Sequence, residues 1–129
     1  MIYLDNSATT KPCKEAVDAF LSVAEEEYGN PSSVHEMGAE AAKILKDARE
    51  TVAKAMHVDA GEIVFTSGGT MADNLAVLGG VSVKRGGKVV TTAIEHPAVK
   101  NAMAALEAQG IRVTYVNPGK DGVVSAESI

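Results

Sequence analysis

Residues 87–116, "GKVVTTAIEHPAVKNAMAALEAQGIRVTYV", contain the pattern from which the fold class can be predicted. Its two ends, 87–93 and 111–116, are rich in the β-branched residues that strands prefer, whereas Pro97 to Gln109 is rich in helix formers. Gly110 suits the left-handed position that commonly follows a helix. Two strands joined by a helix of this length form a parallel pair, because an antiparallel pair needs only a short turn. The stretch therefore predicts a βαβ unit.

The flanking sequence extends this pattern in both directions. "EIVFT" at 62–66 predicts an earlier strand, and the residues from Thr70 to Val83 predict the helix that follows it. After residue 116, "NPGKDG" predicts a turn, Val123 and Val124 a strand stub, and "SAESI" at 125–129 the first turn of another helix. We therefore expect an α/β fold with a mostly parallel sheet flanked by helices.

Two helices are predicted ahead of the sheet. Apolar residues recur at helical spacing after Pro12, in an amphipathic segment that closes at Gly29. Ser33 followed by Glu36 fits a capping box, and a long helix is predicted from there to His57. The predicted organisation is an N-terminal segment with helices over 1–60, then the first βαβ units of a larger domain over 61–129, which is truncated.

Composition limits the possible functions. With 46% hydrophobic residues, the 129-residue chain can bury a core, and its formal net charge of -5 argues against binding to nucleic acid or an anionic membrane. The single cysteine cannot form an internal disulfide. The opening "MIYLDNSATT" lacks the basic and apolar regions of a secretory signal, so we expect a cytoplasmic protein.

The junction "TSGGT" at 66–70 lies where a predicted strand gives way to a helix. Ligands of α/β sheets bind beyond the carboxyl ends of strands, where a helix offers unpaired amides and the positive end of its dipole. Gly68 and Gly69 would let the main chain approach a phosphate closely, and Thr70 could add a hydroxyl donor. Asp73, three residues after Thr70, allows the alternative of a simple helix cap, which this stretch alone favours.

Two common nucleotide motifs are missing. A P-loop needs a glycine five residues before its Gly-Lys pair, but Ser82 stands at that offset from Gly87 and Lys88. The dinucleotide fingerprint G-x-G-x-x-G does not occur. ATP and NAD are therefore disfavoured as ligands.

His96 follows the strand predicted at 87–93 and directly precedes Pro97, which suits a first helical position. Its imidazole should lie at the same edge of the sheet as the glycine junction, where it could stack on an aromatic ligand ring and exchange a proton with it. The alternative is an exposed helix cap. His35, His57 and Cys13 have no spacing typical of a zinc site, so no metal is predicted.

Four segments occur together in one order: "YLDNSATT" at 3–10, "YGNPSSVH" at 28–35, "EIVFTSGGTMADNLA" at 62–76 and "EHPAV" at 95–99. In register, they resemble the N-terminal part of the NifS-type cysteine desulfurases, which are pyridoxal-phosphate enzymes of the class V aminotransferase superfamily. The resemblance implies part of the large domain of a fold-type I enzyme. It also implies that Gly69 and Thr70 contact the phosphate of pyridoxal 5'-phosphate and that His96 is a catalytic residue stacked on its pyridine ring.

The implied reaction removes sulfur from L-cysteine, giving L-alanine and an enzyme persulfide. The sulfur would pass to an acceptor such as an iron-sulfur scaffold protein or to tRNA thiolation, and the implied assembly is a homodimer. The family's cofactor-binding lysine, pyridine-binding aspartate and persulfide cysteine have no match here, so the chain alone is expected to be inactive. Met71 also departs from the family, which usually has an acidic residue there.

Two alternatives remain open from the sequence. A selenocysteine lyase or another class V enzyme could share these four segments. A non-catalytic fragment could instead associate with a complementary chain, because unpaired sheet edges require covering.

Overall fold

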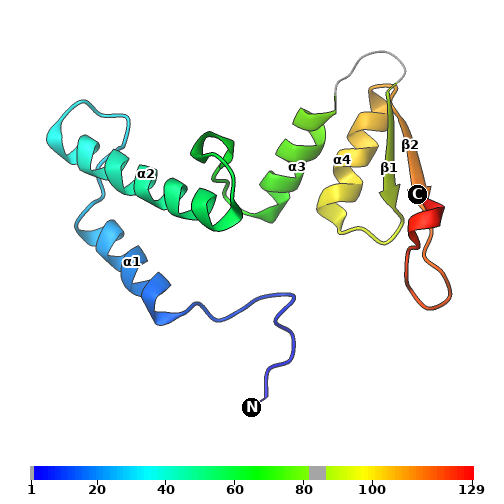
Figure 1. Ribbon diagram of the computed structural model, residues 1–129, viewed down its shortest axis with the longest axis horizontal. Helices are drawn as coiled ribbons and strands as arrows, with labels where there is room; N and C mark the ends of the chain where they lie inside the picture. Colours follow the sequence, from blue (N-terminus) through cyan, green and yellow to red (C-terminus); the bar gives the residue numbers. More distant parts are fainter. Residues whose placement is uncertain (1, 82–86) are drawn as a thin grey trace. The chain divides into compact units, whose positions relative to one another are not determined.

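The computed structural model describes residues 2–81 and 87–129, which form two compact units, Met1–Val64 and Phe65–Ile129 (Figure 1). No helix among these residues has both the length and the apolar character needed to span a bilayer. The first unit is helical and the second contains the sheet.

The first unit holds α1 (Lys14–Glu25), α2 (Glu36–Met56) and the 3-10 turn η1 (Ala60–Glu62). Both predicted helices are present, although α1 ends before the predicted limit at Gly29. The predicted Ser33 cap is wrong. Because α2 begins at Glu36, the capping residue is His35, whose Nδ1 accepts a hydrogen bond from the Gly38 amide at 3.3 Å.

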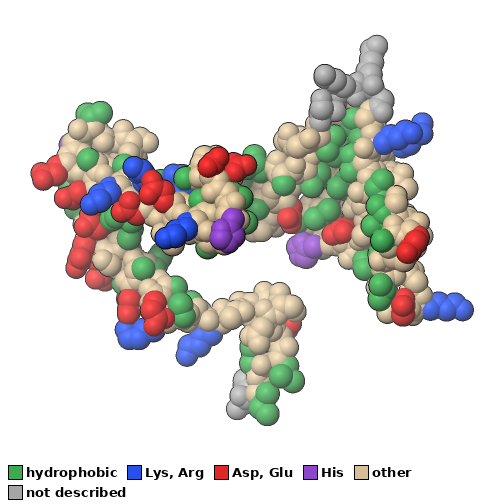
Figure 2. All heavy atoms as spheres, in the orientation of Figure 1, with side chains coloured by type: hydrophobic (Ala, Val, Ile, Leu, Met, Phe, Trp, Pro, Cys, Tyr) green, Lys and Arg blue, Asp and Glu red, His purple; other side chains and the backbone are tan. Residues whose placement is uncertain are grey.

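The end of α2 matches the predicted limit near His57. This residue takes the left-handed conformation with φ 56°, and the Val58 amide donates to the Ala53 carbonyl at 3.0 Å. These two features satisfy the last carbonyls of the helix. Figure 2 shows acidic and basic side chains interspersed along α1 and α2, as expected for surface helices.

The second unit contains α3 (Gly69–Gly80), β1 (Lys88–Thr92), α4 (Pro97–Ala108), β2 (Arg112–Val116) and the 3-10 turn η2 (Ala126–Ser128). Strands β1 and β2 pair in parallel, with Lys88 opposite Arg112 and Thr92 opposite Val116. The predicted βαβ unit and the α/β class are confirmed. The predicted end of the α3 helix, Val83, lies outside the described residues.

Two predicted strands and one predicted helix differ from the structure. Residues 63–66 of "EIVFT" and the Val123–Val124 pair have no strand conformation, and 126–128 form a 3-10 turn rather than an α-helical one. The described residues offer neither segment a strand partner, since the described sheet consists of β1 and β2. A strand depends on hydrogen bonds to a neighbour, so β-rich composition alone does not produce one.

The core of the second unit lies between α4 and the sheet. Met103, Leu106 and Ile111 are buried, and Leu106 is only 1% exposed. They are packed by half-buried valines from α3, α4, both strands and the residue after α3: Val77, Val81, Val89, Val99 and Val113.

Gly110 closes α4 with φ 85°, as predicted. Its amide donates to the Glu107 carbonyl at 2.9 Å, and the Ile111 amide donates to the Leu106 carbonyl at 3.1 Å. This left-handed turn sends Ile111 back into the core before β2 begins, so it links the end of the helix to the strand.

Candidate functional site

The start of α3 has free amide donors. Gly68 is the residue before the helix and has no side chain to cap it, and the first turn holds no acidic residue. Among the described residues, no group accepts a hydrogen bond from the amides of Gly69 and Thr70. Unpaired amides at a helix N-terminus favour an anion.

The simple cap that the sequence allowed at this junction is not formed. Thr70 lies at the second position inside the helix, so its hydroxyl does not cap it, and its carbonyl accepts from Asn74 Nδ2 at 2.7 Å. The Thr70 hydroxyl makes no hydrogen bond within the described part of the chain. It remains a donor for a ligand, as does the Thr70 amide.

The two glycines face open space. A Cβ built on Gly68 or Gly69 would meet no heavy atom within 4 Å, and both residues are exposed. The Gly68 carbonyl accepts from the Ala72 amide at 3.1 Å and from Thr66 Oγ1 at 3.2 Å. Because the peptide is trans, the Gly69 N–H points opposite to this carbonyl, away from the helix. The residues present therefore fit a phosphate group.

Met71 occupies the position where the resembled family usually has an acidic residue. Its thioether sulfur lies 3.5 Å from the Ser67 hydroxyl, and the side chain is half exposed. With a neutral residue here, the first turn of α3 supplies no carboxylate to offset the positive end of the helix dipole.

His96 is the residue before α4, and its Nδ1 accepts a hydrogen bond from the Ala98 amide at 3.2 Å. The helix-cap alternative is thus correct as a description of geometry. It does not exclude ring stacking, because the cap uses only the in-plane lone pair of Nδ1 and the ring remains exposed. An acceptor at Nδ1 places the hydrogen of the neutral ring on Nε2.

The starts of α3 and α4 belong to the same end of the second unit. The two helices pack against each other, and Figure 1 shows both beginning at the end toward which the β1 arrow points. This is the carboxyl edge of the parallel strands, where α/β proteins bind ligands. The fold brings the residue pair Gly69 and Thr70 to the same edge as His96.

Two hydrogen bonds at this edge were not predicted from the sequence. Thr92 Oγ1 donates to Glu95 Oε1 at 2.7 Å, and the Ala93 amide donates to the Val116 carbonyl at 2.8 Å. Both fix the turn that leads into His96. The spacing of a hydroxyl and a carboxylate three residues apart is the only sequence signal for the first contact, and it is a weak one.

Among the titratable groups of the described residues, three have displaced pKa values, and none of the three belongs to this site. Glu15 and Glu127 have lowered pKa values, chiefly because each carboxylate accepts a backbone amide hydrogen bond. The pKa of Tyr115 is raised by desolvation and by the neighbouring Glu107 carboxylate, which accepts its hydroxyl at 3.1 Å.

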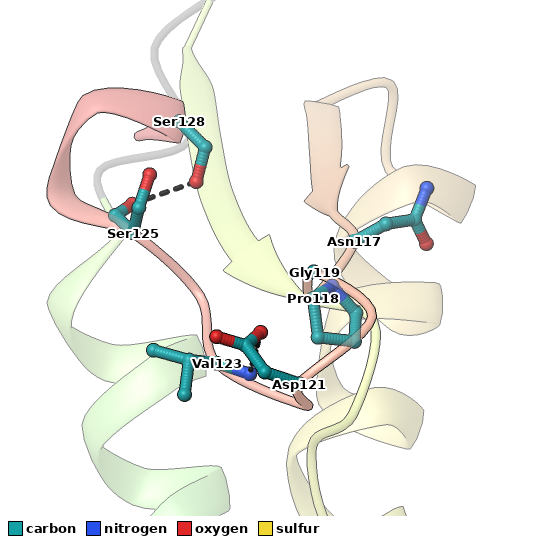
Figure 3. Close-up of a pocket in the computed structure, with 7 residues that line it drawn as sticks. All are labelled: Asn117, Pro118, Gly119, Asp121, Val123, Ser125 and Ser128. Carbon is teal, nitrogen blue, oxygen red and sulfur yellow. Dashed lines mark hydrogen bonds between the residues drawn. The ribbon is translucent and has the colours of Figure 1, made fainter.

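In the described part of the chain, two pockets have linings that include none of the predicted site residues. One, of about 420 Å³, follows β2 and is lined by Asn117, Pro118, Gly119, Asp121, Val123, Ser125 and Ser128 (Figure 3). In this pocket the Asp121 carboxylate accepts a hydrogen bond from the Val123 amide at 3.1 Å, so it is already bonded to the backbone of its own turn. The other, of about 260 Å³, is an apolar groove in the first unit. The described residues contain no cluster of metal-ligating side chains.

Comparison with known proteins identifies relatives of this chain. The family described as aminotransferase class V matches residues 2–129. The cysteine desulfurase IscS of Methanosarcina thermophila is 43% identical over 130 residues, covering 99% of this chain and 32% of the relative. The cysteine desulfurase of Trichormus azollae is 42% identical, covering 100% of this chain and 32% of the relative.

Solved structures give the same result. A NifS-like protein superposes with a TM-score of 0.85 at 38% identity, covering 95% of this chain and 34% of that one. SspA in complex with cysteine superposes with a TM-score of 0.88 at 33% identity, covering 97% of this chain and 37% of that one. The chain spans about a third of the length of the curated relatives it matches.

Proposed function

Because the chain belongs to the aminotransferase class V family, we propose that it is the N-terminal portion of a pyridoxal-phosphate-dependent cysteine desulfurase. The parent enzyme removes sulfur from L-cysteine, giving L-alanine and an enzyme persulfide. The observation that carries this proposal is that the amides of Gly69 and Thr70 make no hydrogen bond to the described residues and are exposed at the edge of the sheet that also presents His96.

The start of α3 holds the cofactor phosphate in this proposal. The amides of Gly69 and Thr70 and the Thr70 hydroxyl donate hydrogen bonds to the phosphate oxygens, and the helix dipole favours their negative charge. Glycine at 68 and 69 keeps side chains out of the space that the phosphate occupies. These residues bind and orient the cofactor but carry out no bond breaking.

His96 has two parts in the proposed site. Its ring face stacks on the cofactor's pyridine ring, while Nδ1 stays bound to the Ala98 amide. Its Nε2–H then remains available as a hydrogen-bond donor to a bound ligand. The bound cofactor supplies the electron-accepting ring that makes cleavage of the cysteine C–S bond possible.

The chain alone is proposed to be inactive. None of its nine lysines lies in the Ser-x-His-Lys context of the family's cofactor-binding lysine. Cys13 is exposed and precedes α1 in the first unit, so it does not match the persulfide cysteine of a later loop. The parent enzyme is proposed to work in the cytoplasm as a homodimer and to pass its sulfur to an acceptor such as an iron-sulfur scaffold protein.

A chimera tests this proposal. The 129 residues replace the matching segment of the Methanosarcina thermophila relative, whose remainder supplies the missing part of the enzyme, and sulfide release from L-cysteine is measured. We expect the chimera to release sulfide and the isolated chain to release none. A folded chimera that binds pyridoxal phosphate but does not desulfurate cysteine would contradict the proposed activity.

A further inference from the structure

We propose that Thr92 and Glu95 form a clasp that positions the His96 ring, so that both are positioning residues for the site. This inference rests on the proposed function for its purpose, but the geometry of the clasp stands independently of any ligand. Neither residue is needed to touch the cofactor or the substrate.

The clasp closes the short turn between β1 and α4. Thr92, the last residue of β1, donates its hydroxyl to Glu95 Oε1 at 2.7 Å, and both side chains are half-buried. A hydroxyl bonded to a carboxylate is a charge-assisted hydrogen bond, which is stronger than a bond between neutral groups. Since Glu95 immediately precedes His96, holding its side chain restricts the direction in which the chain enters the helix.

Each end of the turn is anchored as well. At its start the Ala93 amide donates to the Val116 carbonyl of β2 at 2.8 Å, which continues the pairing of the two strands. At its end His96 Nδ1 accepts from the Ala98 amide, and the His96 carbonyl accepts from the Val99 amide at 3.0 Å. The clasp bridges the remaining segment between these two anchors.

The clasp matters because the His96 cap is weak by itself. Its N–H···N distance of 3.2 Å is at the long end for a hydrogen bond, and the ring is exposed. An exposed side chain with only one long hydrogen bond changes rotamer easily unless the backbone that places its bonding partner is held. A ring that stacks on a cofactor must instead keep one orientation before the cofactor arrives.

The first experiment measures the His96 ring in the chain without a ligand. Side-chain NMR couplings report whether the ring keeps one χ1 rotamer in the wild type and in four variants: Thr92→Val, Glu95→Ala, Thr92→Ser and Glu95→Gln. We expect one rotamer in the wild type and averaging in Thr92→Val and Glu95→Ala. Thr92→Ser and Glu95→Gln keep a donor and an acceptor, so they should restore the single rotamer.

Thr91→Val is the matched control. Thr91 lies on the same strand with similar burial, and its hydroxyl makes no hydrogen bond to the described residues. The control should leave the His96 ring unchanged. A single rotamer persisting in both Thr92→Val and Glu95→Ala would overturn the proposed clasp.

The second experiment adds pyridoxal phosphate and records the induced circular dichroism of its visible band. We expect Thr92→Val to weaken the apparent affinity by about threefold, because about one in three χ1 rotamers of the released ring can stack on the cofactor. Thr91→Val should leave the apparent affinity unchanged. Equal affinity of Thr92→Val and the wild type would contradict the positioning role. If the clasp variants release the ring but the wild type gives no induced signal, the proposed function fails while the clasp stands.

Discussion

Replacing His96 separates its helix-capping role from its proposed role as a stacked ring. Asparagine is among the best residues at the position before a helix, so His96→Asn should keep a hydrogen bond to the first turn of α4 while removing the imidazole. His96→Ala removes both. Both variants therefore lose the imidazole ring, but only His96→Ala also loses the cap and should be less stable.

The size of the stability effect follows from the cap geometry. Losing a cap costs about 0.5–2 kcal/mol, and the 3.2 Å bond of an exposed ring places His96 in the lower half of that range, at about 0.5–1 kcal/mol. For a unit of this size, spanning Phe65–Ile129, 1 kcal/mol corresponds to roughly 4–8 °C in Tm. His96→Ala should thus lower the Tm of this unit by about 2–8 °C, and His96→Asn should leave it nearly unchanged.

Thermal unfolding followed by circular dichroism measures the first effect, and the induced signal of bound pyridoxal phosphate measures the second. His35→Asn is the matched control, because His35 Nδ1 also accepts a first-turn amide, that of Gly38 in α2, and His35 has no proposed contact with the cofactor. A His96→Asn variant as unstable as His96→Ala would refute the capping argument. Undiminished cofactor binding by His96→Asn would refute the stacking role.

Four further predictions follow from the same contacts. Gly69→Ala should reduce affinity for pyridoxal phosphate about tenfold, because the new methyl enters the phosphate space, while leaving the unfolding temperature unchanged or higher; Gly79→Ala, equally open, should leave the affinity unchanged in the same titration. Leu106→Ala should destabilise the second unit by about 2–5 kcal/mol in urea unfolding, since Leu106 is buried in its core. Gly110→Ala should cost about 1–2 kcal/mol in the same assay, because φ 85° strains a residue with a Cβ. Glu107→Gln should lower the raised pKa of Tyr115, as measured in an ultraviolet titration. In the wild type, the stability that this raised pKa contributes is present below the pKa of tyrosine in the unfolded chain. It is lost as the pH rises through the pKa of Tyr115 in the folded protein.

The sequence predicted those parts of the fold that local chemistry determines. Periodicity located all four α-helices of the described residues, and Gly110 ended α4 where a left-handed residue was expected. The β-branched runs around Val89 and Val113 became strands because each had the other as a partner. The run at 62–66 is similar in composition but pairs with no strand among the described residues, and local sequence does not show whether a strand will find a neighbour to pair with.

The candidate site, like the fold, could be predicted from the sequence only in part. Residue type and order indicated Gly69, Thr70 and His96, but only coordinates show that the Thr70 cap is missing and that His96 Nδ1 is already bound. The Thr92 and Glu95 contact was not predicted, because a threonine and a glutamate three residues apart are common in turns that make no such bond. Capping by His35 rather than Ser33 was missed because the first residue of α2 was placed too early.

Phosphate binding by the amides at the start of α3 underlies the proposed function. The most direct measurement follows the Gly69 and Thr70 amide resonances by NMR while the chain is titrated with pyridoxal phosphate, and separately with pyridoxal, which lacks the phosphate. We predict that both resonances move with pyridoxal phosphate and stay in place with pyridoxal. Resonances that ignore pyridoxal phosphate, or that move equally with both compounds, would contradict the account.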